Sequence, residues 1–422
     1  MPVVSVRLST LGSEYEKRQH HIIQTVCIVA ILILVAVGGF LYSHHMRLHE
    51  FLERSRHQIQ YSLFNNSCND TIVVGHHKEL FLRSDLDNIT GKHLQYHYQC
   101  IDSAKAEALR NIQATLTMID TLHRHGTEFL FVFCPYKPAV YPEYLPKTFY
   151  NEIAEFSLVN YYIELCKEKG IPHIDFYNYF QSIKKEFPYP LYAQTGSHWA
   201  ESTIPFICDT LFRKMEALTG YQLPSINIID NNISTDYSIQ DKELEKHLGL
   251  LFPISKPAIP RPIFALADTV GKDRPHLLVV GDGYYNQISQ SCFVDAFRQA
   301  DYWIYNKSIR STHPYYDQKQ TNNIFDAAEV FEDTDIVMAM FSPNYLFNYL
   351  CGFIPYLHEQ LQHGNYSDEE IIAILINKIK LNQEWYQSVE QQAQDLGITV
   401  DENLLRHAQY LFENMKQSKA TN

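Results

Sequence analysis

The feature that most restricts the fold of this chain is a run of four apolar residues, 277–280, followed at once by Gly281, Asp282 and Gly283. An uninterrupted apolar run that ends at a glycine turn is typical of a strand buried on both faces. Residues 286–298 then carry the pattern of a helix. Catalytic chains with this strand–turn–helix pattern carry a serine directly after Gly-Asp, and here position 283 is glycine. The segment predicts a hydrolase-like site without its nucleophile.

The same alternation of strands and helices runs through the middle of the chain. Predicted strands lie at 129–133, 171–175, 277–280, 302–305 and 336–341. Predicted helices lie at 103–124, 151–169, 199–218 and 286–298. Strands separated by single helices form a parallel sheet covered on both faces, so we expect an α/β fold. Two short apolar runs at 71–74 and 80–82 predict a hairpin before it.

The segment 221–274 interrupts this alternation. It contains Pro253, Pro257, Pro260 and Pro262, and one short charged helix is predicted near 241–248. We interpret the segment as an excursion within a single domain, residues 68–345, because strand and helix patterns resume after it.

An apolar stretch at residues 22–42 contains no charged side chain. Its 21 residues are long enough for one transmembrane helix. A cleaved signal peptide has a shorter apolar region with a small-residue site after it. We therefore expect residues 1–21 in the cytoplasm, a single membrane span at 22–42, and a polar helical stalk at 43–67. The large domain would then lie on the periplasmic, extracytoplasmic side.

Residues 346–422 are expected to form a helical segment of a different kind. Ser367 with Glu370, and Thr399 with Glu402, have the spacing of two capping boxes. Gly397 provides a natural end for a helix at 382–396.

Composition excludes some functions and leaves others open. The net charge of −13 argues against a nucleic-acid partner. The 29 Tyr and 24 Phe suit a surface that holds a sugar, and they suit an aromatic-rich core equally well. None of the eight cysteines has the spacing of a metal or redox motif, so no metal and no cofactor are expected. Cys68 and Cys100 flank one segment and could pair in an oxidising compartment.

Three segments are expected to meet at the carboxyl edge of the sheet, where ligands bind in open parallel sheets. They are Pro135–Pro146, Thr195–Trp199 and Gly281–Gly283. If the cleft holds a sugar chain, it should be shallow and lined by three tyrosines, Tyr136, Tyr192 and Tyr284.

His198 is the candidate general base of this cleft. A serine nucleophile needs an imidazole to take its proton and a carboxylate to hold that imidazole, and the carboxylate is expected two residues before the histidine. This chain has Gly196 there and Gly283 at the nucleophile position. Asp282 is expected to cap the following helix. Taken alone, His198 is better explained as an inert, hydrogen-bonded residue beside Trp199, because the chain has 20 histidines.

Together these motifs resemble the AlgX/AlgJ-type SGNH-hydrolase-like proteins, which O-acetylate exopolysaccharides such as alginate in the periplasm. Residues 74–82 resemble that family's opening hairpin, 135–146 its P-x-K…Y-P-E-x-L-P segment, 195–199 its T-D-x-H-W loop, and 279–283 its V-x-G-D-S turn. The resemblance covers most of residues 70–422. It implies a three-layer, flavodoxin-like SGNH domain, a polysaccharide ligand, and a membrane-bound O-acyltransferase as a possible partner.

Carried over residue by residue, the resemblance makes His198 the catalytic base and places the family's aspartate on Gly196 and its serine on Gly283. The substrate contacts that we expect are Lys137, Tyr136, Tyr141, Tyr192, Tyr284 and Trp199. Lys137 could equally be a plain surface lysine.

No convincing replacement for the serine is present. Ser197 adjoins His198, Ser289 and Ser291 lie about two turns further on, and Tyr284 is a poor acyl carrier. Two interpretations remain: an O-acetyltransferase or esterase, and a degenerate, non-catalytic module that binds polysaccharide or an acyltransferase.

Overall fold

The computed structural model describes residues 25, 26, 28–40, 42, 43, 47–306, 308–311, 334–355, 357, 367–381 and 383–420. The chain divides into two units. The first comprises residues 1–70 and 245–255, and the second comprises 71–244 and 256–422. Each is considered by itself.

The first unit contains the helix α2 (Leu48–Phe64), which lies within the predicted stalk. It ends at Asn65 in the left-handed conformation. The His57 ring contacts the Leu248 carbonyl at 3.0 Å, and the Phe252 N–H donates to Gln58 Oε1 at 3.1 Å. These bonds hold residues 245–255 of the excursion to the helix.

The predicted membrane span lies partly outside the described residues, which omit 22–24, 27 and 41. Residues 28–40 are helical. Among the helices that are described, none combines the length and the apolar character needed to cross a bilayer.

The second unit is built on a mixed sheet with the strand order β4-β3-β10-β7-β8-β9. Its first five strands run parallel, and β9 is antiparallel to β8. Their bounds are β3 (Glu128–Phe133), β4 (His173–Asp175), β7 (His276–Gly281), β8 (Gln299–Ile304), β9 (Ser308–Ser311) and β10 (Ile336–Phe341). The α/β fold with a parallel sheet, expected from the apolar runs, is confirmed.

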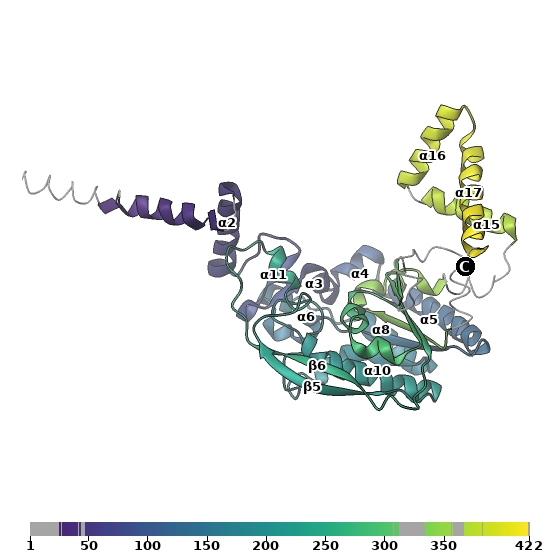
Figure 1. Ribbon diagram of the computed structural model, residues 1–422, viewed down its shortest axis with the longest axis horizontal. Coiled ribbons are helices and arrows are strands. Elements are labelled where there is room, and N and C mark those ends of the chain that lie inside the picture. Colours follow the sequence, from purple (N-terminus) through teal and green to yellow (C-terminus); the bar gives the residue numbers. More distant parts are fainter. Residues whose placement is uncertain are drawn as a thin grey trace, which may run out of the picture. The chain divides into compact units, whose positions relative to one another are not determined.

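Helices cover the two faces of this sheet (Figure 1). Successive residues of a strand point to opposite faces. Thus Phe129, Phe131 and Phe133 pack with α5 (Ile101–Arg124) and α8 (Leu158–Lys169). The alternate residues of β3 pack on the other face, with α9 (Phe176–Ile183) and α10 (Ile204–Thr219). Both faces are buried, which explains why the strands read as continuous apolar runs.

Short elements connect these layers. The predicted hairpin is present as β1 (Ile72–Val74) and β2 (Leu80–Leu82). Others are η1 (His76–Lys78), α3 (Arg83–Ile89), α4 (Lys92–His97), α6 (Lys137–Val140), η2 (Pro142–Tyr144), α7 (Lys147–Tyr150), η3 (Glu201–Thr203), α11 (Glu243–His247), η4 (Gly283–Tyr285) and η6 (Pro343–Tyr345).

The local structure differs from the prediction in several segments. The helix predicted at 151–169 begins at Leu158, and the helix predicted at 199–218 begins at Ile204. The helix predicted at 286–298 is broken into α12 (Asn286–Ser289) and η5 (Cys292–Ala296), because the Ser291 hydroxyl accepts from the Phe293 N–H and starts a new turn. The excursion contains a long antiparallel ribbon, β5 (Ser225–Ser234) with β6 (Ile259–Ala267), which the sequence analysis did not predict. Two of its prolines, Pro260 and Pro262, lie on β6, a strand with one described partner, where a missing N–H is tolerated.

The C-terminal helices have an apolar core of their own. They are α15 (Asp368–Leu381), α16 (Gln383–Leu396) and α17 (Val400–Ala420). Ile371, Leu375, Val389, Leu404 and Phe412 are among the residues of this core. The predicted cap at Thr399 is confirmed, since its hydroxyl accepts from the Glu402 N–H at 3.2 Å.

The cysteines that the structure describes are all free thiols. Cys68 and Cys100, considered above as a pair, are therefore not joined.

Candidate functional site

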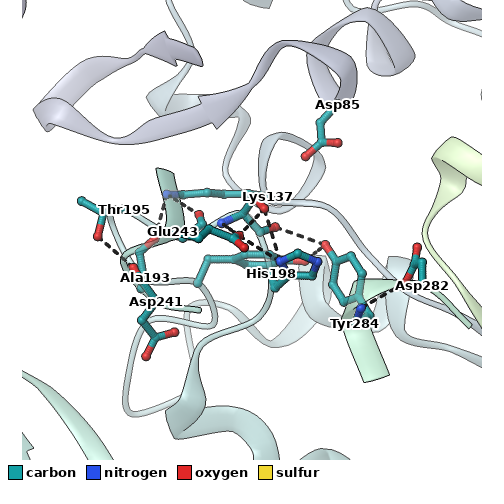
Figure 2. Close-up of polar contacts among 12 residues, drawn as sticks. Asp85, Lys137, Ala193, Thr195, His198, Asp241, Glu243, Asp282 and Tyr284 are labelled. Atoms are coloured by element: carbon teal, nitrogen blue, oxygen red, sulfur yellow. Dashed lines mark hydrogen bonds and ion pairs between the residues drawn. The ribbon is translucent and has the colours of Figure 1, made fainter. Parts of the chain in front are cut away.

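The loops that follow β3 and β7 meet the segment 193–198 at the carboxyl edge of the sheet (Figure 2). The ammonium of Lys137, after β3, donates to the carbonyl of Ala193. A Cβ atom added at Gly283, after β7, would lie 2.6 Å from His198 Nε2. The predicted convergence of the three segments is confirmed.

Lys137 is a buried structural cation. Its side chain is 1% exposed, and the Nζ atom lies 2.8 Å from the carbonyls of Ala193 and Gln194 and 3.4 Å from that of Gly196. It also pairs with Glu79 at 2.8 Å. Burial lowers the pKa of Lys137, against the opposing charge of Glu79. Its three N–H donors face four acceptors, which leaves none for a substrate. The expected substrate contact at Lys137 is therefore not available.

His198 has a carboxylate partner that the sequence analysis missed. Its Nδ1–H donates to Glu243 Oε1 at 2.9 Å, and each side chain is 24% exposed. The same oxygen accepts from the Ser197 N–H at 2.8 Å and from the Ser197 hydroxyl. Figure 2 shows Glu243 and His198 facing each other. Glu243 thus does for the imidazole what the aspartate of a triad does.

Hydrogen bonds to Thr195 hold the part of the excursion that carries Glu243 next to His198. The Thr195 hydroxyl donates to the Asp241 carbonyl at 2.8 Å, and the Thr195 carbonyl accepts from the Leu244 N–H at 3.0 Å. The Asp241 carboxylate accepts in turn from the Glu201 N–H at 3.2 Å. Residues 241–244 are therefore fixed against the loop that carries His198.

Gly196 shows why the carboxylate comes from elsewhere. A Cβ atom at this position would lie 3.2 Å from the Gln240 carbonyl oxygen and 3.3 Å from the Asp241 backbone. Both are tighter than ordinary contacts and involve main-chain atoms. An aspartate at 196 would press against the segment that brings Glu243 into place.

The His198 ring lies at the position that the Cβ atom of a nucleophilic side chain at 283 would occupy. The 2.6 Å between Nε2 and a Cβ at position 283 is shorter than real contacts allow, and the next ring atom would be 3.2 Å away. The ring also meets Tyr284 edge-on, with centroids 4.8 Å apart. With glycine at 283, the imidazole occupies space that a serine would need.

The charges of the site favour a protonated ring. Burial lowers the pKa of His198, but the hydrogen bond and charge of Glu243, with Asp282 and Asp85, raise it above its ordinary value. Burial has the opposite effect on Glu243 and raises its pKa. The hydrogen bonds and charge of His198 and Ser197 outweigh burial and lower the pKa of Glu243 to about 2. The two groups therefore stabilise each other's charged forms, the imidazolium of His198 and the carboxylate of Glu243.

Asp282 caps the turn after β7, as expected. Its carboxylate accepts from the Tyr284 N–H at 3.1 Å and from the Ser342 N–H at 2.8 Å. Burial raises the pKa of Asp282 despite these bonds. Asp282 thus has a structural role in the turn.

The three tyrosines that were predicted to line a cleft at His198 are buried. Tyr136, Tyr192 and Tyr284 are 2–4% exposed, and Trp199 is fully buried. The hydroxyl of Tyr192 donates to the Pro135 carbonyl at 2.9 Å and lies 3.2 Å from that of Tyr284. These rings belong to the core. Among the predicted aromatic contacts, Tyr141 alone is half-buried, and its hydroxyl accepts from the Leu191 N–H.

Asp85 is a further carboxylate of the site that the sequence analysis did not single out. It is 4% exposed, and the Asn344 side chain donates to it at 2.8 Å. Burial raises its pKa to about 7, while the charge of His198 opposes this rise. Figure 2 shows Asp85 on the far side of His198 from Asp241. Among the residues that the structure describes, no group of three or more His, Cys, Asp or Glu is arranged to hold a metal ion.

No protein-family model and no curated protein matches the chain. Among solved structures it is similar to the O-acetyltransferase domain of Pseudomonas putida AlgJ, with 15% identity and a TM-score of 0.41 over 68% of this chain and 98% of that one. It is also similar to Pseudomonas aeruginosa AlgX, with 14% identity and a TM-score of 0.43 over 72% of this chain and 70% of that one. It is similar as well to Bacillus cereus PatB1, with 9% identity and a TM-score of 0.35 over 58% of this chain and 92% of that one.

The structure comparison thus finds AlgJ and AlgX, the proteins that the sequence motifs resemble. The identities are 15% or below and the TM-scores are below 0.5, so no activity is transferred from them to this chain.

Replacing Glu243 by glutamine is expected to lower the pKa of His198. The amide keeps the shape of the side chain and removes the charge that raises the pKa of the ring above 6.5. An NMR titration of the His198 ring measures this directly. The matched control is Glu143→Gln, which changes a carboxylate that is bound to Lys184 instead. An unchanged His198 midpoint in Glu243→Gln would show that the two groups are not coupled.

The same variant should change how stability depends on pH. The raised pKa of His198 contributes stability below about 6.5, which is lost as pH rises through the folded-state value. The lowered pKa of Glu243 contributes stability above about 4.5, which is lost as pH falls toward 2. The difference in free energy of unfolding between wild type and Glu243→Gln should therefore peak between about pH 4.5 and 6.5.

Proposed function

We propose that this chain is a membrane-anchored, extracytoplasmic protein of the polysaccharide O-acetylation kind, with an SGNH-type domain, and that it binds its saccharide without carrying an acyl group on serine. The observation that supports this most strongly is the position of the His198 ring, whose Nε2 lies 2.6 Å from where a side chain at Gly283 would begin. In this proposal the loops are arranged as in an acyl-transfer site, and the His198 ring occupies the position of the nucleophile.

The loss of the serine outweighs the gain of Glu243. In serine hydrolases, loss of the nucleophile costs about 10⁶ in kcat, and what remains comes from binding and oxyanion contacts. Ser197 does not replace it, because its hydroxyl is bound to Glu243 on the Nδ1 side of the ring. A histidine–carboxylate pair alone carries no acyl group here.

In its protonated form, which Glu243 favours, His198 is better suited to hold an oxygen than to take a proton. A ring that already carries both protons offers Nε2–H as a donor, and a general base needs a free lone pair. Asp85 and Asp282 lie around it, which disfavours an anionic ligand at this point. A hydroxyl or carbonyl oxygen of a polysaccharide fits such a donor.

The cellular setting of the proposal follows from the apolar stretch at 22–42. We infer one membrane span there, with the α/β domain outside the cytoplasm and beside newly exported polysaccharide. A membrane-bound O-acyltransferase is the partner that would supply acetylation, with this chain presenting the polysaccharide or binding the acyltransferase itself.

The wild-type protein should hydrolyse p-nitrophenyl acetate no faster than its His198→Ala variant, because no residue takes up the acetyl group. The matched variant Gly283→Ser adds a hydroxyl beside Nε2, and since that atom ends a side chain, the ring can yield. We expect its rate to exceed that of wild type by about tenfold or more, and to fall again when His198→Ala is added. Wild-type hydrolysis that depends on His198 would contradict the proposal.

A reporter fused to the C-terminus tests the location. An alkaline phosphatase fusion, active only outside the cytoplasm, should be active in the full chain. It should become inactive when residues 22–42 are deleted, since the domain would then lack its export segment. Phosphatase activity that is independent of 22–42, or no activity in the full chain, would overturn the topology.

A further inference from the structure

A cavity of about 670 Å³ lies in the α/β unit, and neither His198, Glu243 nor Gly283 lines it. Its walls come from α3, α4, the start of α5, α6, α9 and the segment 153–159. Small-molecule sites typically measure about 300–1,000 Å³. The cavity is therefore large enough for a ligand of two or three rings.

Two kinds of side chain in its lining suit sugar rings, and they stand beside aliphatic side chains such as Leu94 and Ile153. The aromatic members are His93, Phe156 and Phe347, together with the edges of two core rings, Tyr136 and Tyr177, which are 3% and 7% exposed. The carboxamides are Asn88, Gln95, Gln99 and Gln181. Aromatic rings present apolar faces that pack on the C–H faces of a sugar. Carboxamides exchange hydrogen bonds with hydroxyl groups.

Two of the carboxamides already form hydrogen bonds within the protein, Asn88 through both of its N–H donors and Gln181 through one of them. Asn88 Nδ2 donates to Asn344 Oδ1 at 2.7 Å and contacts the His93 ring at 3.3 Å. Gln181 Nε2 donates to the Tyr177 carbonyl at 3.0 Å. The oxygens of Asn88 and Gln181 remain as acceptors. A ligand rich in hydroxyl donors matches them.

The charge of the walls selects against anionic sugars. The described residues that line the cavity include Glu155 and no Lys or Arg. The whole chain carries a net charge of −13. A uronate or phosphate group would meet no lysine or arginine among the lining residues, the Lys105 ammonium being placed over the Phe156 ring at 5.3 Å, and it would be repelled by the net charge at long range. A hydrocarbon chain would cover the free amide oxygens without bonding them, which is unfavourable.

We infer that this cavity binds a neutral saccharide segment, at a place separate from His198. The inference rests on the proposed function and deepens it, since it assigns the class of polysaccharide and the part of the molecule that holds it. Asn344, which bonds Asn88, also donates to Asp85 at 2.8 Å, so a chain of amide contacts joins the cavity wall to the His198 site.

Calorimetric titration of the full chain in detergent tests the inference with four probes. Cellotriose and maltotriose are neutral, a trimer of mannuronate is anionic, and decanoate represents an acyl chain. We expect a neutral trisaccharide to bind more tightly than the uronate trimer and decanoate. Preferred binding of the uronate or of decanoate would overturn the assignment.

Cavity variants locate the binding. Ala139→Trp places a large ring inside the cavity and should weaken binding by about tenfold or more. The matched control Ala106→Trp lies on an exposed position of α5 outside the cavity and should leave affinity within about twofold. The double variant Gln95→Ala/Gln99→Ala changes exposed rim residues and should weaken binding by about fivefold or more.

The outcomes separate the inference from the proposed function. A neutral saccharide that binds equally well to wild type and to both cavity variants would overturn this cavity as the site while leaving the proposed function standing. If Ala139→Trp does not fold, the glutamine pair decides alone. If no saccharide binds, the inference and the saccharide-binding function both fail. Ester hydrolysis is measured separately and reports only on the missing nucleophile.

Discussion

The candidate site depends on the buried ammonium of Lys137. A cation that is 1% exposed is stable only when all its donors are paired, and this one binds Glu79 and the carbonyls of Ala193, Gln194 and Gly196. It thereby joins the loop after β3 to the loop that carries His198. Removing one member of such a buried pair typically costs about 3–5 kcal/mol, so the position of the histidine is tied to the stability of this contact.

On that frame, two glycines and one glutamate determine the character of the site. Gly196 lets the backbone of 240–241 approach closely, and the same segment then delivers Glu243 to His198 at 2.9 Å. Gly283 lets the ring move into the place of the nucleophile. The two differences from the expected triad are therefore related, since the carboxylate is supplied from another segment and the nucleophile is not supplied at all. The result is an imidazole that is held by a carboxylate and whose pKa is raised.

The sequence predicted those parts of the fold and site that depend on local pattern and on topology. Apolar runs located the strands because both faces of the sheet are buried. The rule that ligands bind at the carboxyl edge of a parallel sheet correctly predicted that His198 lies near Gly283. The sequence did not predict Glu243, which lies 45 residues from His198 and reaches it through Thr195, a tertiary contact without a local signal. Nor did it predict that Tyr192 and Tyr284 are buried, because a tyrosine in a loop carries no mark of its burial.

The central claim is that no residue of this chain carries an acyl group through His198. Treatment of the purified protein with methanesulfonyl fluoride, followed by intact-mass measurement, tests it most directly, because this reagent traps a nucleophile that a neighbouring imidazole activates. The account predicts the same mass profile for wild type and His198→Ala, and a new adduct at position 283 in Gly283→Ser. A stoichiometric adduct on the wild type that disappears in His198→Ala would contradict it.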